Sequence, residues 1–139
     1  MESLGLDNFS PAQQQVLNLL NQYAEYEQEN RHSKSLLIEF AERHENCCER
    51  TLTIGHFTGS CWLVSKDGQR VLLTHHKKLE RWLQLGGHAD GDSDLAQVAL
   101  REAEEESGLT DLSVEPEIFD LERHAIPARG SDAEHYHHD

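Results

Sequence analysis

Three glutamates near the end of one segment are spaced to share a face of a helix. Glu102, Glu105 and Glu106 follow one another by steps of three and one, which places them within an arc of about 100° on an α-helix. Their charges repel one another, and the Gly108 that follows indicates a helix end, where the helix dipole also disfavours acids. Clustered carboxylates suit Mg²⁺ or Mn²⁺. The helix alone leaves a second interpretation open, an ordinary glutamate-rich surface helix.

The residues before this helix favour the metal site. Residues 82–85 predict a short strand that ends abruptly at Gly86 and Gly87, and paired glycines allow a sharp turn and a close backbone approach. A polar loop over 88–92 follows, and then a helix from about residue 93 to 107. We therefore expect the glutamates to be held against a sheet by a glycine turn.

This segment resembles the signature of the Nudix hydrolases. Gly87 opens the pattern, and the run REAEEESGL from Arg101 to Leu109 matches its end, R-E-U-x-E-E-x-G-U with U apolar. The family places a glutamate six residues after the glycine, where this chain has Ser93. Every other specified position of the box agrees.

The resemblance implies an α/β protein, a Nudix-type α/β/α sandwich with a mixed sheet. It implies hydrolysis of a nucleoside diphosphate linked to another moiety, by water attack on phosphorus. Carried over by position, it assigns the binding of Mg²⁺, with Mn²⁺ as an alternative, to Glu102, Glu105 and Glu106. It also makes Glu105 or Glu106 the candidate that orients or deprotonates the water, unless a base on a later loop does so.

The resemblance further assigns to Arg101 the stabilisation of the loop and helix. Ser93 replaces a glutamate that usually supports this arginine, which implies weaker bracing rather than lost metal binding. Asp92 and Asp94 are candidate substitutes for that glutamate.

Histidines form two further groups of interest. His88 lies just after Gly87, where phosphate and metal should sit, so we expect both residues to contact substrate; an ordinary loop role is the alternative. The segment EHYHHD at 134–139 predicts a strand start. Strand alternation would place His135, His137 and Asp139 on one face, so a transition-metal site or a half-buried strand are both open interpretations.

The elements around the box define two parts. Residues 10–45 predict two helices, a hairpin, with a capping box at Ser10 and Gln13 and a second cap at Ser33. Their apolar stripes, over 16–23 and 36–44, predict packing or a homodimer surface. We expect residues 1–50 to be an N-terminal helical extension and 51–139 to be the Nudix-type domain, with the C-terminal part of that fold missing.

The later segments read as strands. Runs over 60–65 and 70–75 flank Asp67 and Gly68, a strong hairpin signal. Residues 112–114 and 117–125 again predict extended structure, interrupted at Pro116.

Composition limits the function classes. The net charge of −14 disfavours a nucleic acid polymer as partner, whereas a small nucleotide-derived diphosphate remains possible if cations bridge it. No apolar run is long enough to span a membrane, and three cysteines predict free thiols and a cytoplasmic protein. The leading interpretation is a Mg²⁺-dependent diphosphate hydrolase; the alternative is a non-catalytic or truncated Nudix-fold module that binds a nucleotide or a protein.

Overall fold

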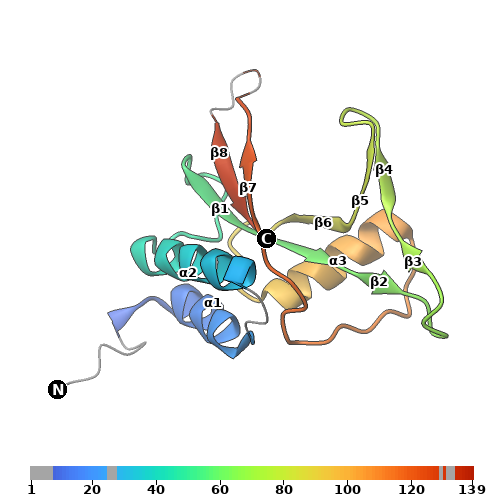
Figure 1. Ribbon diagram of the computed structural model, residues 1–139, viewed down its shortest axis with the longest axis horizontal. Helices are drawn as coiled ribbons and strands as arrows, with labels where there is room; N and C mark the ends of the chain where they lie inside the picture. Colours follow the sequence, from blue (N-terminus) through green and yellow to red (C-terminus); the bar gives the residue numbers. More distant parts are fainter. Residues whose placement is uncertain (1–7, 25–27, 129, 131–133) are drawn as a thin grey trace.

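The largest sheet of the protein is mixed. The computed structural model (Figure 1) describes residues 8–24, 28–128, 130 and 134–139. Strand β1 (Gly55–Cys61) pairs antiparallel with β6 (Leu85–His88) and parallel with β8 (His135–His138), and β8 pairs antiparallel with β7 (Arg123–Ile126). The strand order β6-β1-β8-β7 and the helices around it confirm the α/β class and the mixed sheet.

Two further hairpins lie at the end of the molecule away from α1 and α2 (Figure 1). Strands β2 (Leu63–Val64) and β3 (Val71–Leu72) pair with each other, as do β4 (Thr74–His76) and β5 (Arg81–Leu83). The predicted turn between β2 and β3 is confirmed, because Gly68 has a φ of 72° that favours glycine.

The prediction that a strand ends at Gly86 and Gly87 is wrong. Both glycines lie inside β6, opposite Ser60 and Gly59 of β1. A Cβ on Gly86 would overlap the Ser60 hydroxyl, so the glycine is needed for close strand packing. The positive φ angles lie further along, at Asp90 and Gly91.

The segment before β7 is also less regular than predicted. Strand β7 begins only at Arg123, and residues 109–122 form neither helix nor strand. Extended residues become a strand only where another strand pairs with them, and β8 pairs with β7 over four positions alone.

The two N-terminal helices are α1 (Pro11–Gln22) and α2 (Gln28–Arg43). The capping box is confirmed, since Ser10 accepts a hydrogen bond from the backbone N–H of Gln13 and the Gln13 side chain returns one. The predicted cap at Ser33 is wrong, because α2 already begins at Gln28. The apolar period marks the buried face of a helix rather than its full length; residue 27 of the predicted break lies outside the described residues.

One hydrophobic cluster joins the N-terminal helices to the sheet and to α3 (Leu95–Ser107). Phe40 of α2 stacks on His138 of β8 with ring centroids 3.9 Å apart, and it also contacts Phe57 of β1. Both parts of the predicted division therefore contribute to one core. The stripes proposed as a dimer surface are largely buried in it; a homodimer through another surface stays a prediction. The members of the cluster that are at most 2% exposed are Val16, Leu17, Leu20, Leu37, Ala41, Cys47, Cys48, Phe57, Ala89 and Val98.

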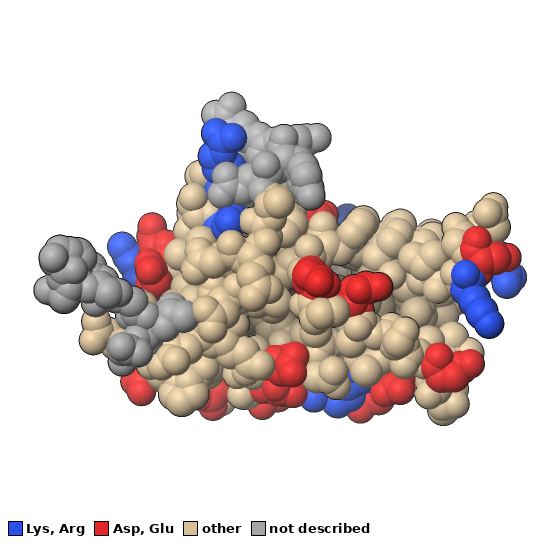
Figure 2. Space-filling view, turned by 90° about the horizontal axis from the view of Figure 1, so that it is seen from below, with Lys and Arg blue, Asp and Glu red and all other residues tan. Residues whose placement is uncertain are grey.

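The apolar content of the helices and the distribution of surface charge agree with the composition of the sequence. In the described part of the chain no helix is both long and apolar enough to cross a bilayer. Acidic side chains are distributed over the face shown in Figure 2 instead of forming one patch. The three cysteines are free thiols.

Burial of His138 should make the protein sensitive to acid. Its ring is 3% exposed, and neither ring nitrogen has a hydrogen-bond partner. Burial first, and then the charges of Arg123, His56, His137 and His44, lower the pKa of His138 to about 3. Between about pH 3 and 6.5 the unfolded chain therefore binds a proton that the folded protein does not, so this contribution to stability is full above pH 6.5 and is lost on acidification.

We expect the free energy of unfolding to fall by about 1.4 kcal/mol between pH 7.5 and 5.5 from this histidine alone. The measurement is urea unfolding of the wild type and of His138→Phe, which keeps an aromatic ring but has nothing to protonate. The variant should lose correspondingly less stability. An equal loss in both proteins would show that His138 is not responsible.

Candidate active site

Helix α3 carries the glutamates. It ends at Gly108, as the sequence predicts, and begins at Leu95, two residues after the predicted start. Asp94 caps the start by accepting a hydrogen bond from the Gln97 N–H, at 3.2 Å. At the other end Gly108 is left-handed, with a φ of 77°, and its N–H donates to the Glu104 carbonyl. The glutamates consequently occupy the last two turns, at the negative end of the helix dipole.

Two of the three glutamates contact the glycines of β6. The Glu106 carboxylate accepts a hydrogen bond from the Gly86 N–H at 2.9 Å. Glu102 lies against Gly87, where a Cβ would overlap its carboxylate. Since β6 is at the edge of its sheet, the free side of this strand and the end of α3 meet along the glutamates.

The electrostatics of Glu102 reflect the crowding of acids. Its side chain is 21% exposed, whereas Glu105 and Glu106 are exposed. Burial first, and then the charge of Glu105, raise the pKa of Glu102, with Glu106 adding to the effect. A carboxylate whose charged form is disfavoured in this way would be stabilised by a cation.

The three carboxylates are neighbours but do not form a closed cage. Among the described residues, the one group of three metal-ligating side chains whose ligand atoms all lie within 4.8 Å of one another consists of His56, His88 and His137. The glutamates do not form such a group. Glu102 interacts with the Glu105 side chain, and Glu105 and Glu106 are exposed.

Arg101 is paired with Asp92, one of the two residues expected to replace the missing glutamate of the box. Its Nη1 lies 3.5 Å from a carboxylate oxygen of Asp92, and its Nε lies 3.8 Å from Glu102. Asp94 serves instead as the helix cap. The Ser93 hydroxyl hydrogen-bonds to the Gln15 side chain of α1 at 2.6 Å, so this position connects the box to the N-terminal helices.

A cavity of about 250 Å³ lies on the other side of the glycines. In the wall of this cavity, the Asp139 carboxylate accepts hydrogen bonds from the Thr58 and Ser60 hydroxyls, at 2.7 and 2.8 Å. Because glycines have no side chain, only the backbone of β6 separates this cavity from Glu102 and Glu106. The lining residues are Thr58, Ser60, Gly86, Gly87, His88, His124, His137 and Asp139.

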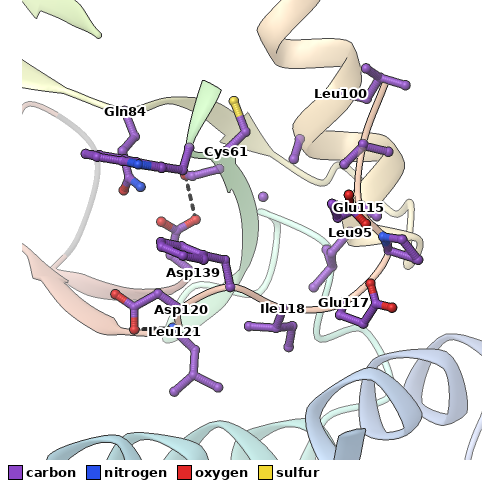
Figure 3. A pocket seen from close by; sticks show the side chains of 18 of the residues that line it. Cys61, Gln84, Leu95, Leu100, Glu115, Glu117, Ile118, Asp120, Leu121 and Asp139 are labelled. Atoms are coloured by element: carbon purple, nitrogen blue, oxygen red, sulfur yellow. Dashed lines mark hydrogen bonds between the residues drawn. The ribbon is translucent and has the colours of Figure 1, made fainter. Parts of the chain in front are cut away.

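A larger cavity, about 620 Å³, follows α3 and the irregular segment before β7. Figure 3 shows Leu95 and Leu100 of α3 beside Glu115 of that segment, with Cys61 and Gln84 across from them. Most of its lining is apolar, and none of the three box glutamates borders it. It has the size of a ligand site, but the carboxylates that border it do not come from the box. They belong to the irregular segment before β7 and to the last residue, and they are Glu115, Glu117, Asp120, Glu122 and Asp139.

Sequence reasoning missed three polar residues of β1. His56, Thr58 and Ser60 alternate with Phe57 and Gly59, so strand periodicity indicates that they share a face. The missing information was which strands lie beside β1, because His88 and Asp139 come from distant parts of the chain.

The packing at Gly87 predicts a loss of activity without a loss of fold. In Gly87→Ala the new methyl group displaces the Glu102 carboxylate, which sits at the end of a flexible side chain. We expect at least about tenfold lower hydrolytic activity, comparable to the loss of an outer-shell metal partner, and a nearly unchanged urea midpoint.

Gly59→Ala is the matched control for that substitution. There a Cβ would lie 2.9 Å from the Leu95 carbonyl oxygen and 2.9 Å from Val98 Cγ1, atoms that cannot move freely. Overpacking of this kind costs about 1–3 kcal/mol of stability. Equal destabilisation by both substitutions would contradict the distinct role assigned to Gly87.

Comparison with known proteins agrees with this geometry. No curated protein matches the chain. The family model described as NUDIX domain matches residues 56–138, which is more than half of the chain and includes the glutamates, Arg101 and the glycines of β6. With this match and a mixed sheet that holds the box helix against an edge strand, the chain belongs to the Nudix family.

Proposed function

We propose that this protein is a Mg²⁺-dependent hydrolase that cleaves the diphosphate linkage of a nucleoside diphosphate joined to another moiety. Family membership supports a hydrolase in general. The observation that carries the finer proposal is the position of the glutamates. Glu102 and Glu106 contact the backbone of β6, and the cavity on its other side is large enough for a phosphate group.

The donor set fits a hard divalent cation. Glu102, Glu105 and Glu106 supply carboxylate oxygens, which Mg²⁺ and Mn²⁺ prefer. Burial and the neighbouring glutamates raise the pKa of Glu102 even though Arg101 lies nearby, so a further cation would stabilise its charged form. When bound, Mg²⁺ neutralises a diphosphate and lowers the pKa of a coordinated water. The cation thereby also reconciles a protein of net charge −14 with an anionic substrate.

The remaining catalytic and binding roles fall to the glutamates and to the residues around them. Glu105 or Glu106 accepts the proton of the attacking water, whose oxygen bonds to phosphorus as the bridging P–O bond breaks. Arg101, held by Asp92, positions the loop and the helix. Gly87 and His88 line the cavity. We place part of the substrate there, with its diphosphate across the free edge of β6 beside the glutamates.

The proposal includes a cellular location and a class of binding partner. The free thiols favour a cytoplasmic location. The acidic surface favours small nucleotide-derived substrates over nucleic acid polymers. These assignments depend on the same substrate class.

An activity screen tests the proposed function. The full chain is incubated with Mg²⁺ or Mn²⁺ and a panel of nucleotide sugars, dinucleotides, coenzyme diphosphates and oxidised nucleotides. Release of a nucleoside monophosphate, absent in a variant with glutamine at 102, 105 and 106, is expected. Binding of a nucleotide without turnover of any compound would instead support the alternative, a non-catalytic binding module.

A further inference from the structure

Three histidines from three strands meet on the face of the sheet that points away from α3. His56 of β1 lies directly beside His137 of β8, and His88 of β6 pairs with Thr58 two residues further along β1. Alternate residues of a strand share a face, so these side chains project together. The opposite face carries Gly59, whose position contacts Val98 of α3.

The rings are close enough to act as one group. Ring centroids are separated by 4.9 Å for His56 and His137, 5.2 Å for His56 and His88, and 5.2 Å for His88 and His137. One ligand nitrogen from each ring lies within 4.8 Å of the others. Two nitrogens bound to the same tetrahedral zinc are about 3.4 Å apart, so the rings need to approach by at most about 1.5 Å.

Burial leaves His56 without adequate partners. Its side chain is 3% exposed, and neither ring nitrogen makes a well-aligned hydrogen bond, although the backbone of Leu52 is near enough to favour the protonated ring slightly. A buried polar atom without a partner costs about 1–3 kcal/mol. A bound ion would remove that cost while the Leu52 backbone orients the ring.

We propose that His56, His88 and His137 bind one transition-metal ion, with Zn²⁺ the best match. Imidazole nitrogens suit zinc, whereas Mg²⁺ prefers the carboxylate oxygens of α3. The chain thus has two chemically distinct metal sites, and this one goes beyond the proposed hydrolytic function.

The protonation states and nearby charges agree with metal binding. Burial, reinforced by the neighbouring histidines, lowers the pKa of His137 to about 3. The pKa values of His56 and His88 are lowered chiefly by burial as well. All three rings are therefore neutral near pH 7, as metal ligation requires.

The charge of Arg50, which acts on His56 and His88, does not prevent binding. Arg50 is paired with Asp90 at 2.8 Å, so its charge is largely compensated. A carboxylate, that of Asp139, borders the same cavity as His88 and His137. His135 lies behind His137 and contacts it, with the two Nε2 atoms 3.3 Å apart. His88 and His137 also line the cavity in which we place the substrate, so His88 is shared by the two sites.

The test separates the two metal sites. Zn²⁺ is titrated calorimetrically into the 139-residue chain with glutamine at 102, 105 and 106, and Co²⁺ is titrated in parallel with visible absorption as the readout. We expect one bound ion and the intense absorption bands of four-coordinate, nitrogen-ligated cobalt. His88→Ala and His137→Ala should each weaken Zn²⁺ binding at least about tenfold, and His32→Ala, at an exposed position of α2, should leave it unchanged.

Several results would overturn the proposal. One is the absence of Zn²⁺ binding by the protein with glutamine at 102, 105 and 106. Another is an equal Zn²⁺ affinity in the His88, His137 and His32 variants. If a variant fails to fold, imidazole ¹⁵N spectra of the unsubstituted chain decide: Zn²⁺ should shift the signals of His56, His88 and His137, and shifts confined to other histidines would refute the site. Because no diphosphate is present, failure here is distinguishable from failure of the hydrolase proposal.

Discussion

Glu106→Gln should lower kcat/KM for diphosphate hydrolysis at least about 100-fold, the lower end of what one general base contributes. The substitution removes a negative charge from the proposed Mg²⁺ site and also removes a group that can accept the proton of the attacking water. Glutamine keeps an oxygen that can accept the Gly86 N–H bond now made by Glu106. The fold should therefore persist, and steady-state kinetics at saturating Mg²⁺ measure the loss.

Glu104→Gln is the matched control. Glu104 lies on the same helix but outside the arc of the three box glutamates, and its identified role is a backbone one, since its carbonyl accepts the capping bond from Gly108. The control should retain nearly full activity and magnesium affinity. Wild-type turnover in Glu106→Gln, or equal losses in both variants, would remove Glu106 from the mechanism.

Phe57→Ala should cost about 3–5 kcal/mol in the free energy of unfolding. Phe57 is 1% exposed and contacts Phe40 of α2 and His138 of β8. Truncating it leaves a cavity where the N-terminal helices, the sheet and α3 meet. Urea unfolding followed by far-ultraviolet circular dichroism measures the change.

Phe119→Ala controls for the loss of an aromatic ring as such. Phe119 is 75% exposed, so its removal should change stability by less than about 0.5 kcal/mol. The Phe57 variant also tests whether residues 1–50 form a separate unit. One shared core predicts a single transition that moves as a whole; a helical transition unaffected by Phe57→Ala would support two independent parts.

The chemistry of the box could be predicted because it depends on local rules. Side chains three and four residues apart share a helical face, and a left-handed glycine ends a helix. Those two rules are enough to place Glu102, Glu105 and Glu106 on the last turns before Gly108. The capping box at Ser10 and the hairpin at Gly68 were predictable for the same reason, since each involves only neighbours in the chain.

Pairing between distant strands could not be predicted in this way. The alternation of residues 134–139 predicts that His135, His137 and Asp139 share a face, and the ring contacts of the histidines and the hydrogen bonds of Asp139 agree with it. Alternation does not say that His56 of β1 lies beside His137. The histidine group needs the register of three strands, and register depends on contacts between residues far apart in sequence.

The same distinction explains the glycines and the N-terminal helices. Two adjacent glycines permit either a turn or close packing, and only the positions of Ser60 and Glu102 select the second at Gly86 and Gly87. An apolar helical stripe must be buried, but its composition does not identify what covers it. For α1 and α2 the cover is the sheet face around Phe57, because hydrophobic burial rewards any complementary apolar surface and the folded topology determines which one is within reach.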